Sequence, residues 1–119
     1  MNFKLTVMNI SASFRPSTRE KAAQMSNDPL LQPYQLKHLT LRNRIMITSH
    51  EPAYPEDGMP KGRYRAYHVE RAKAGVALTM TAGSAAVAKD SPPVFNNILA
   101  YRDEVVGWMK QLVDECHDH

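Results

Sequence analysis

The sequence contains a single cysteine, Cys116, among 119 residues, which excludes an internal disulfide and a four-cysteine zinc or iron–sulfur site. It also lacks a run near the roughly 18 apolar residues that span a bilayer, so no membrane span is expected. Basic residues number 15 against 12 acidic ones, interleaved and without a run of five. A mixed solvated surface is therefore favoured over a nucleic-acid interface.

Several short motifs of catalysis are missing. There is no G-x-G-x-x-G and no P-loop, so nucleotide sites of those kinds are not indicated. The segment Gly83-Ser84-Ala85 lacks the second glycine of a nucleophile elbow. Cys116, His117 and His119 contain metal-ligating groups, but Cys116 falls on an apolar helix stripe and the histidines lie at the helix end. We expect no metal site there.

The first 27 residues differ in composition from the rest of the chain. Met1 to Ser26 carries four basic residues against one acidic residue, with several serines and threonines. This composition loosely resembles a transit peptide, but it also fits a disordered extension or a start codon placed too far upstream, with Met25 as the native start. No secretory core is present, and we expect a cytoplasmic protein. We expect residues 28–119 to form the structured part, as an incomplete domain.

The chain after Leu30 alternates between short strands and helices. Tyr34 to His38 and Leu39 to Asn43 show period-two alternation and predict a β-hairpin. Arg44 to Thr48 is typical of a strand buried on both faces, and the breakers in Ser49 to Lys61 predict a loop. Gly62 to Ala74 predicts a helix. Its recurring positions are Tyr64, Tyr67, Arg71 and Ala74.

The second half repeats the strand and helix pattern. Val76 to Thr81 predicts a buried strand, and Ala82 to Pro93 a loop of small residues and prolines. Asp103 is placed to cap a final helix. One apolar stripe of that helix comprises Val105, Met109, Leu112, Val113 and Cys116.

The order of these elements is hairpin, strand, helix, strand, helix. Two buried strands joined by a helix predict a parallel pair with a right-handed crossover. Two parallel strands cannot bury both faces of a sheet, so the sequence predicts the beginning of a larger α/β fold. The alternative is a self-contained small domain.

In parallel α/β folds, ligands lie at the carboxyl ends of the strands. Those ends are Thr48 to Glu51 and Thr81 to Ser84, where small residues either admit a flat ligand or merely turn the chain. His50 is the best single candidate because it opens a loop after a buried strand; the alternative is a structural loop histidine. We expect His68 to be an ordinary helix residue. Tyr64 and Tyr67 are expected in the core.

Three segments resemble the old yellow enzyme family of FMN oxidoreductases. Leu31-Gln32-Pro33-Tyr34-Gln35-Leu36, followed by Leu39 to Ile45, resembles the opening of that family. Tyr67 to Gly75 resembles its first helix, and the closing helix resembles its second through Asp103-Glu104 and Val113-Asp114-Glu115-Cys116-His117. Within the trimethylamine dehydrogenase and dienoyl-CoA reductase branch, Thr48 to Tyr54 and Asp90 to Asn97 are similar to demethylases of small N-methylated amino acids such as dimethylglycine.

The resemblance implies the N-terminal part of a (β/α)8 TIM barrel, comprising a β-hairpin and two βα units, with FMN at the carboxyl face. The family's flavin contacts fall on Thr48, Ser49, His50 and Gly83. His50 is also a tentative catalytic contact to flavin or substrate.

The sequence departs from the family at three positions. The family often has proline at position 49 and glutamate at 82, where this chain has serine and alanine. The cysteine that attaches the flavin covalently in trimethylamine dehydrogenase aligns with Glu51, so the implied FMN is non-covalent. The iron–sulfur ligands of larger members have no counterpart.

The implied activity is oxidative N-demethylation of a small amine such as dimethylglycine. One alternative is an NAD(P)H-dependent ene-reductase, and another is a truncated chain with no activity of its own, because a typical barrel needs about 250 residues. We expect the isolated chain to bind no stoichiometric FMN. For the full-length protein, a homo-oligomer and a complex with an electron-transfer partner are both open expectations.

Overall fold

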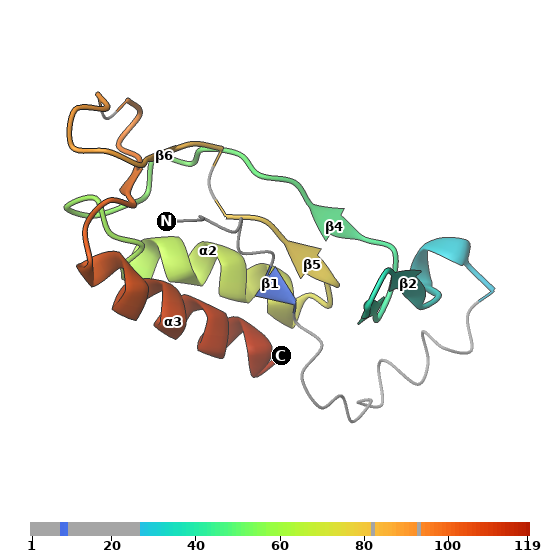
Figure 1. The fold of residues 1–119 in the computed structure, drawn as a ribbon. Helices are drawn as coiled ribbons and strands as arrows, with labels where there is room; N and C mark the ends of the chain where they lie inside the picture. Colours follow the sequence, from blue (N-terminus) through green and yellow to red (C-terminus); the bar gives the residue numbers. More distant parts are fainter. Residues whose placement is uncertain (1–7, 10–26, 82, 93) are drawn as a thin grey trace.

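The computed structural model describes residues 8–9, 27–81, 83–92 and 94–119. These residues form a mixed α/β arrangement, with two helices packed side by side along short strands (Figure 1). The elements in chain order are β1 (Met8–Asn9), η1 (Pro29–Leu31), β2 (Tyr34–Leu36), β3 (Leu39–Leu41), β4 (Met46–Ile47), α2 (Gly62–Lys73), β5 (Leu78–Thr79), β6 (Ala85–Ala86), β7 (Ile98–Leu99) and α3 (Glu104–His117).

The expected parallel pair is present, but only β5 is buried as expected; in β4, which is an edge strand, Met46 is exposed and Ile47 half-buried. β4 and β5 pair in parallel, with Met46 opposite Leu78 and Ile47 opposite Thr79, and α2 connects them. The backbone of β1 pairs with the other edge of β5 in antiparallel orientation, giving the order β1-β5-β4. The other residues of the N-terminal segment, 1–7 and 10–26, lie outside the described residues, and so does the expected start at Met25.

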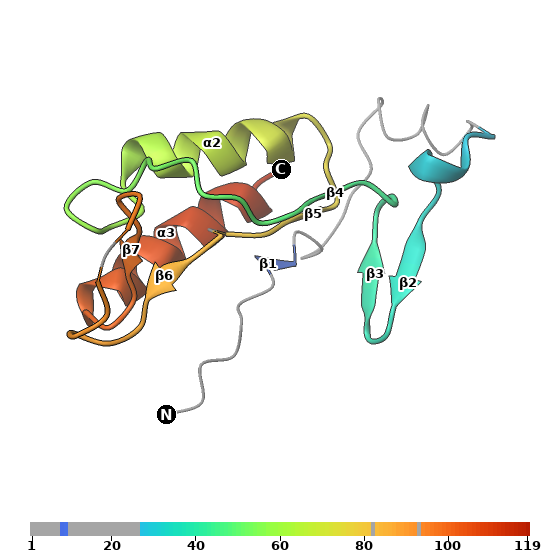
Figure 2. The ribbon, with the colours of Figure 1, turned by 90° about the horizontal axis from the view of Figure 1, so that it is seen from above.

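The predicted hairpin is also confirmed. β2 and β3 pair in antiparallel orientation, with Tyr34 opposite Leu41. The hairpin projects away from the two helices (Figure 2). Asn43, which follows it, joins the two parts of the fold, because its amide donates to the carbonyl of Gly75 at 2.7 Å while its side-chain oxygen accepts from the backbone of Ile45 at 3.0 Å. The start of β4 is thereby fastened to the end of α2.

Helix α2 buries a different face from the one the sequence predicts. It ends before Gly75, as expected, and that glycine adopts a positive φ of 89°. Tyr64 is fully buried, but Tyr67 and Arg71 are only half-buried and Ala74 is exposed. The buried side chains are Tyr64, His68, Val69 and Ala72. Positions 64, 68 and 72 share one helical face. Because position 68 is a histidine, the spacing of apolar residues alone did not predict that this face is buried.

Helix α3 confirms its predicted stripe. Val105, Leu112 and Cys116 are buried, and they form one core with α2 and the segment around Ile98. Burial raises the pKa of the Cys116 thiol to about 11. Asp103 occupies the N-cap position, but its side chain makes no capping hydrogen bond, contrary to expectation. Its backbone is already helical, whereas a capping side chain needs an extended backbone.

The predicted loop from Ala82 to Pro93 contains a strand that the sequence did not indicate. β6 pairs in parallel with β7, with Ala85 opposite Ile98. A strand of two residues is too short to show an alternation of apolar and polar residues, so the sequence contains no pattern that would predict it. The pair turns the chain back toward the loop between β4 and α2 before α3 begins.

Candidate functional site

The carboxyl ends of β4 and β5 lie close together, as the parallel pairing requires. A Cβ atom added to Gly83 would lie 3.3 Å from the backbone nitrogen of Glu51 and 3.4 Å from the carbonyl carbon of His50. A side chain at position 83 would therefore press on the backbone that follows β4. The structure brings together two of the predicted site residues, His50 and Gly83, and explains the glycine by close approach.

Three polar side chains follow β4 in an exposed row. Thr48, Ser49 and His50 are all exposed. Two hydroxyl groups and an imidazole can each donate or accept a hydrogen bond. The predicted positions thus stand exposed at the carboxyl end of β4.

His50 contacts Tyr67, which was expected in the core. The hydroxyl oxygen of Tyr67 lies 2.8 Å from Nδ1 of His50, and the two rings are tilted with centroids 5.2 Å apart. Tyr67 is on α2, one position before the buried His68. Once positions 64, 68 and 72 are recognised as the buried face, position 67 falls on the neighbouring face, and that spacing is the signal that could have found it.

A buried histidine lies behind this pair. Nδ1 of His68 is 2.9 Å from the hydroxyl of Thr79 on β5, and both side chains are buried. Burial, with the charges of Arg71 and His50, lowers the pKa of His68 to about 4. His68 is therefore neutral near pH 7 and joins α2 to the sheet, more than the ordinary helix residue that was expected.

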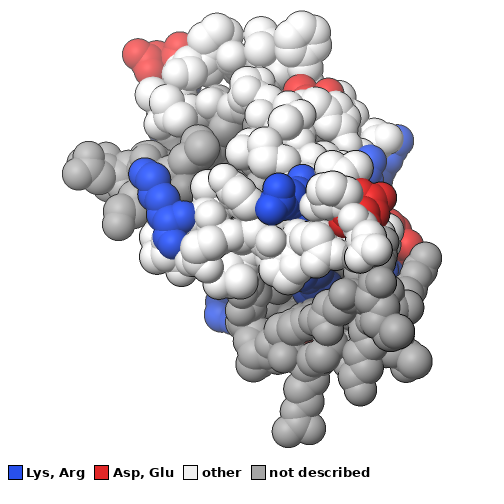
Figure 3. All heavy atoms as spheres, turned by 90° about the vertical axis from the view of Figure 1, so that its right-hand side faces the viewer, with Lys and Arg blue, Asp and Glu red and all other residues white. Residues whose placement is uncertain are grey.

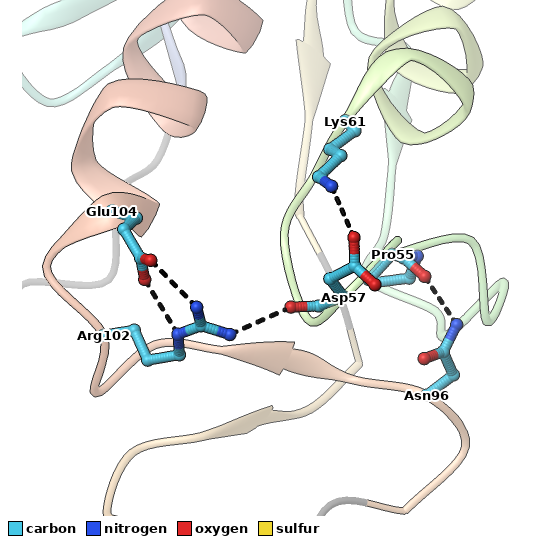
Figure 4. Close-up of polar contacts among 6 residues, drawn as sticks. All are labelled: Pro55, Asp57, Lys61, Asn96, Arg102 and Glu104. Atoms are coloured by element: carbon cyan, nitrogen blue, oxygen red, sulfur yellow. Dashed lines mark hydrogen bonds and ion pairs between the residues drawn. The ribbon is translucent and has the colours of Figure 1, made fainter.

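The loop after β4 is held by hydrogen bonds to its backbone. Ala53 has a positive φ of 55°, and its backbone nitrogen donates to the carboxylate of Glu51 at 3.0 Å. The amide of Asn96 donates to the carbonyl oxygen of Pro55 at 2.5 Å (Figure 4). It also donates to the carbonyl oxygen of Ala53 at 3.3 Å. Asn96 itself has a positive φ of 56°. A positive φ at a residue other than glycine costs energy, so these contacts hold the loop in a shape it would not adopt alone.

A second group of contacts fastens the same loop further on. Arg102 donates twice to Glu104, both at 2.8 Å, and once to the carbonyl of Asp57 at 3.2 Å (Figure 4). The hydrogen bond and charge of Lys61 lower the pKa of the Asp57 carboxyl, and Glu104 raises the pKa of Arg102. The loop that begins at His50 is therefore tied to the chain segment that precedes α3.

A bound flavin is compatible with these residues. FMN presents carbonyl oxygens and ring nitrogens that accept hydrogen bonds, and Thr48, Ser49 and His50 offer exposed donors. Gly83 leaves the backbone at the strand ends uncovered, where a Cβ would fill the space. Among the described residues, no group of three potential metal ligands occurs.

Comparison with known proteins decides the family. The NADH:flavin oxidoreductase / NADH oxidase family matches residues 29–119. The chain belongs to this family. The predicted resemblance to old yellow enzymes is thereby confirmed, and the family implies a flavin cofactor.

Three curated relatives match about four-fifths of the chain. A "Probable N-methylproline demethylase" of Rhizobium meliloti is 78% identical over 94 residues, which is 79% of this chain. A "Multifunctional alkene reductase/demethylase OYE" of Caballeronia cordobensis is 48% identical over 94 residues, again 79% of the chain. An "N,N-dimethylglycine/sarcosine dehydrogenase" of Chromohalobacter salexigens is 34% identical over 97 residues, or 80%. The chain spans 14% of the length of each relative.

The helices of the described residues are short. None of them is both long enough and apolar enough to cross a membrane.

Proposed function

We propose that this chain is the N-terminal part of an FMN-dependent oxidoreductase that removes a methyl group from a small N-methylated amine. Its hairpin and two strand–helix units would begin a (β/α)8 barrel, in which functional residues stand at the carboxyl ends of the strands. The observation that carries the proposal is the meeting of His50 and Gly83 at those ends in a chain of this family. The names of the relatives support the substrate class, since two are named as demethylases and the third as an N,N-dimethylglycine/sarcosine dehydrogenase.

The residues of this chain would bind and orient, while the redox step belongs to the cofactor. The hydroxyls of Thr48 and Ser49 and the imidazole of His50 would donate hydrogen bonds to a non-covalently bound flavin, and Gly83 would let the ring approach the backbone. Bound FMN would supply the hydride acceptor for oxidation of the N-methyl group, and hydrolysis of the oxidised amine would then give the demethylated amine and formaldehyde. His50 is placed to contact either the flavin or a carboxylate of the substrate.

A second function deserves a direct test. The Caballeronia cordobensis relative is named as both an alkene reductase and a demethylase. Reduction of an activated alkene with NAD(P)H would use the same flavin site with the hydride moving in the opposite direction. N-methylproline is the first amine to test, because the relative at 78% identity is named for it, and dimethylglycine is the second.

The test uses the protein expressed from its complete reading frame beside the 119-residue chain. Flavin absorbance after gel filtration measures the cofactor, and formaldehyde release measures demethylation of N-methylproline, dimethylglycine and sarcosine. We expect the complete protein to carry FMN and release formaldehyde, and the 119-residue chain to do neither. Alkene reduction without formaldehyde release would favour the second function. A complete protein that holds no flavin would refute both.

A further inference from the structure

Glu51, which follows His50 beyond the carboxyl end of β4, has two carboxylate oxygens in different surroundings. Oε1 accepts a hydrogen bond from the backbone nitrogen of Ala53 at 3.0 Å. Oε2 is shielded from water and has no hydrogen-bond partner among the described residues. Glu51 as a whole is half-buried, so this oxygen lies close beneath the exposed row of Thr48, Ser49 and His50. A carboxylate oxygen with neither water nor a donor is costly, so this position calls for a donor from outside the described residues.

The acidic side chains that do form ion pairs need them less than Glu51 does. Five acidic side chains among the described residues pair with Lys or Arg, although each of the five is 46% to 81% exposed. They are Asp57, Glu70, Glu104, Asp114 and Glu115. No Lys or Arg in the described part of the chain pairs with Glu51, whose Oε2 is better shielded from water. The chain thus leaves a carboxylate without a countercharge at the candidate site.

The surface beside Glu51 is left uncovered by Gly83. A Cβ atom added to this glycine would lie 3.6 Å from Cβ of Glu51 and 3.3 Å from its backbone nitrogen. Gly83 is itself exposed, so its bare backbone forms an accessible surface where the two parallel strands end. A ligand that rests against Gly83 therefore lies beside the stem of the Glu51 side chain. The uncovered backbone and the unpaired carboxylate belong to one place.

The missing partner of Oε2 has to supply an N–H donor and, to balance the carboxylate, a positive charge. The N-methylated amines of the proposed function carry both when they are protonated near neutral pH. We propose that Glu51 binds the protonated nitrogen of the amine substrate, which donates its N–H to Oε2 while Ala53 holds Oε1. Charge-assisted hydrogen bonds are about twice as strong as neutral ones, and shielding from water strengthens them further. This inference rests on the proposed function, which supplies the substrate class, and adds the residue that selects a cation over a neutral molecule of the same shape.

Two ligands of one shape test this role in the complete flavoprotein. Proline keeps the ammonium that demethylation of N-methylproline leaves, whereas cyclopentanecarboxylate has the same ring and carboxylate with carbon in place of nitrogen. Their dissociation constants are measured by calorimetry without an electron acceptor. We expect the wild type to bind proline about tenfold more tightly than cyclopentanecarboxylate, as for one charge-assisted hydrogen bond. In Glu51→Gln, which still offers an oxygen to the backbone of Ala53, the two constants should differ by less than about twofold.

Turnover gives a second readout of the same contact. For the amine that releases formaldehyde, we expect Glu51→Gln to raise KM about tenfold and to change kcat less than about threefold, because the lost contact holds the substrate before and during the redox step alike. Glu56→Gln is the matched control, since Glu56 lies on the same loop and is exposed. We expect this variant to behave as the wild type in both assays.

Three results would overturn the role of Glu51. The first is a wild type that binds proline no better than cyclopentanecarboxylate, and the second is a Glu51→Gln protein that keeps the wild-type preference. The third is equal weakening of both ligands, or loss of FMN, in Glu51→Gln, which would show that the side chain folds the loop or binds the flavin. Failure of the proposed function is a different result, namely a complete wild-type protein without flavin or without formaldehyde release.

Discussion

The helical side and the open side of this chain bury their apolar residues to very different extents. Leu112 on α3 is fully buried, and the core between the helices continues through Met59 and Ile98. By contrast, Met46 on β4 is 48% exposed and Tyr34 on the hairpin is 43% exposed. On the face seen from the right-hand side of Figure 1, few charged side chains are visible, and they are scattered among uncharged ones (Figure 3).

The difference follows from the number of layers. Helices α2 and α3 pack on each other and along one side of the strands, so their apolar stripes have a partner. In the central strand β5, Leu78 and Thr79 are both buried, whereas Met46 of the edge strand β4 is half exposed. The core between the helices is completed by Met59 and by Ile98 of β7, whereas no layer of the described residues packs over the exposed side chain of β4.

The largest expected effect would break the helical side. Leu112→Ala removes a fully buried side chain between α2 and α3, and a buried leucine lost in this way costs about 4 kcal/mol of unfolding free energy. Met46→Ala on the open side is the control, and we expect it to cost less than about 1 kcal/mol because that side chain is half exposed. Urea unfolding of the chain measures both. Similar losses would contradict the comparison.

The next effect concerns pH and the buried His68. Its pKa falls to about 4 in the folded chain, from 6.5 when unfolded. Between pH 6.5 and pH 4, His68 is protonated in the unfolded chain but neutral in the folded chain. The free energy of unfolding therefore decreases by about 3 kcal/mol as the pH falls through this range. His68→Gln removes the titration. Measured from pH 7 to pH 4, the free energy of unfolding should fall more steeply with decreasing pH for the wild type than for His68→Gln. Equal slopes for the two proteins would contradict this prediction.

The smallest expected effect sharpens the role of contacts between the helices. Glu115 on α3 accepts from Arg65 on α2 at 2.9 Å, and that arginine is mostly buried. The neighbouring Asp114 pairs with Lys110 of its own helix, with both side chains largely exposed. We expect Glu115→Gln to cost about 1 kcal/mol and Asp114→Asn less than about 0.5 kcal/mol in thermal unfolding. The reverse order would show that the contact between the helices contributes nothing.

Long periodic elements were predictable from the sequence, and short or polar ones were not. The stripe that contains Leu112 and Cys116 predicted α3, because apolar spacing there matches the helical period. The buried face of α2 was misassigned because it includes His68, whose burial depends on a hydrogen bond to Thr79 that no local pattern encodes. The strand at Ala85 was missed because two residues carry no period.

For the candidate site, the sequence by itself predicted that His50 and Gly83 lie near each other, since each follows a segment expected to be a parallel strand and parallel strands end at one edge. Only the tertiary structure decided that Gly83 meets the backbone of His50 and Glu51, that Asn96 holds the loop after β4, and that Tyr67 reaches the imidazole. The physical reason is that strand and helix periods are local properties of the chain. A hydrogen bond between distant residues depends on how the elements pack, which the whole fold sets at once.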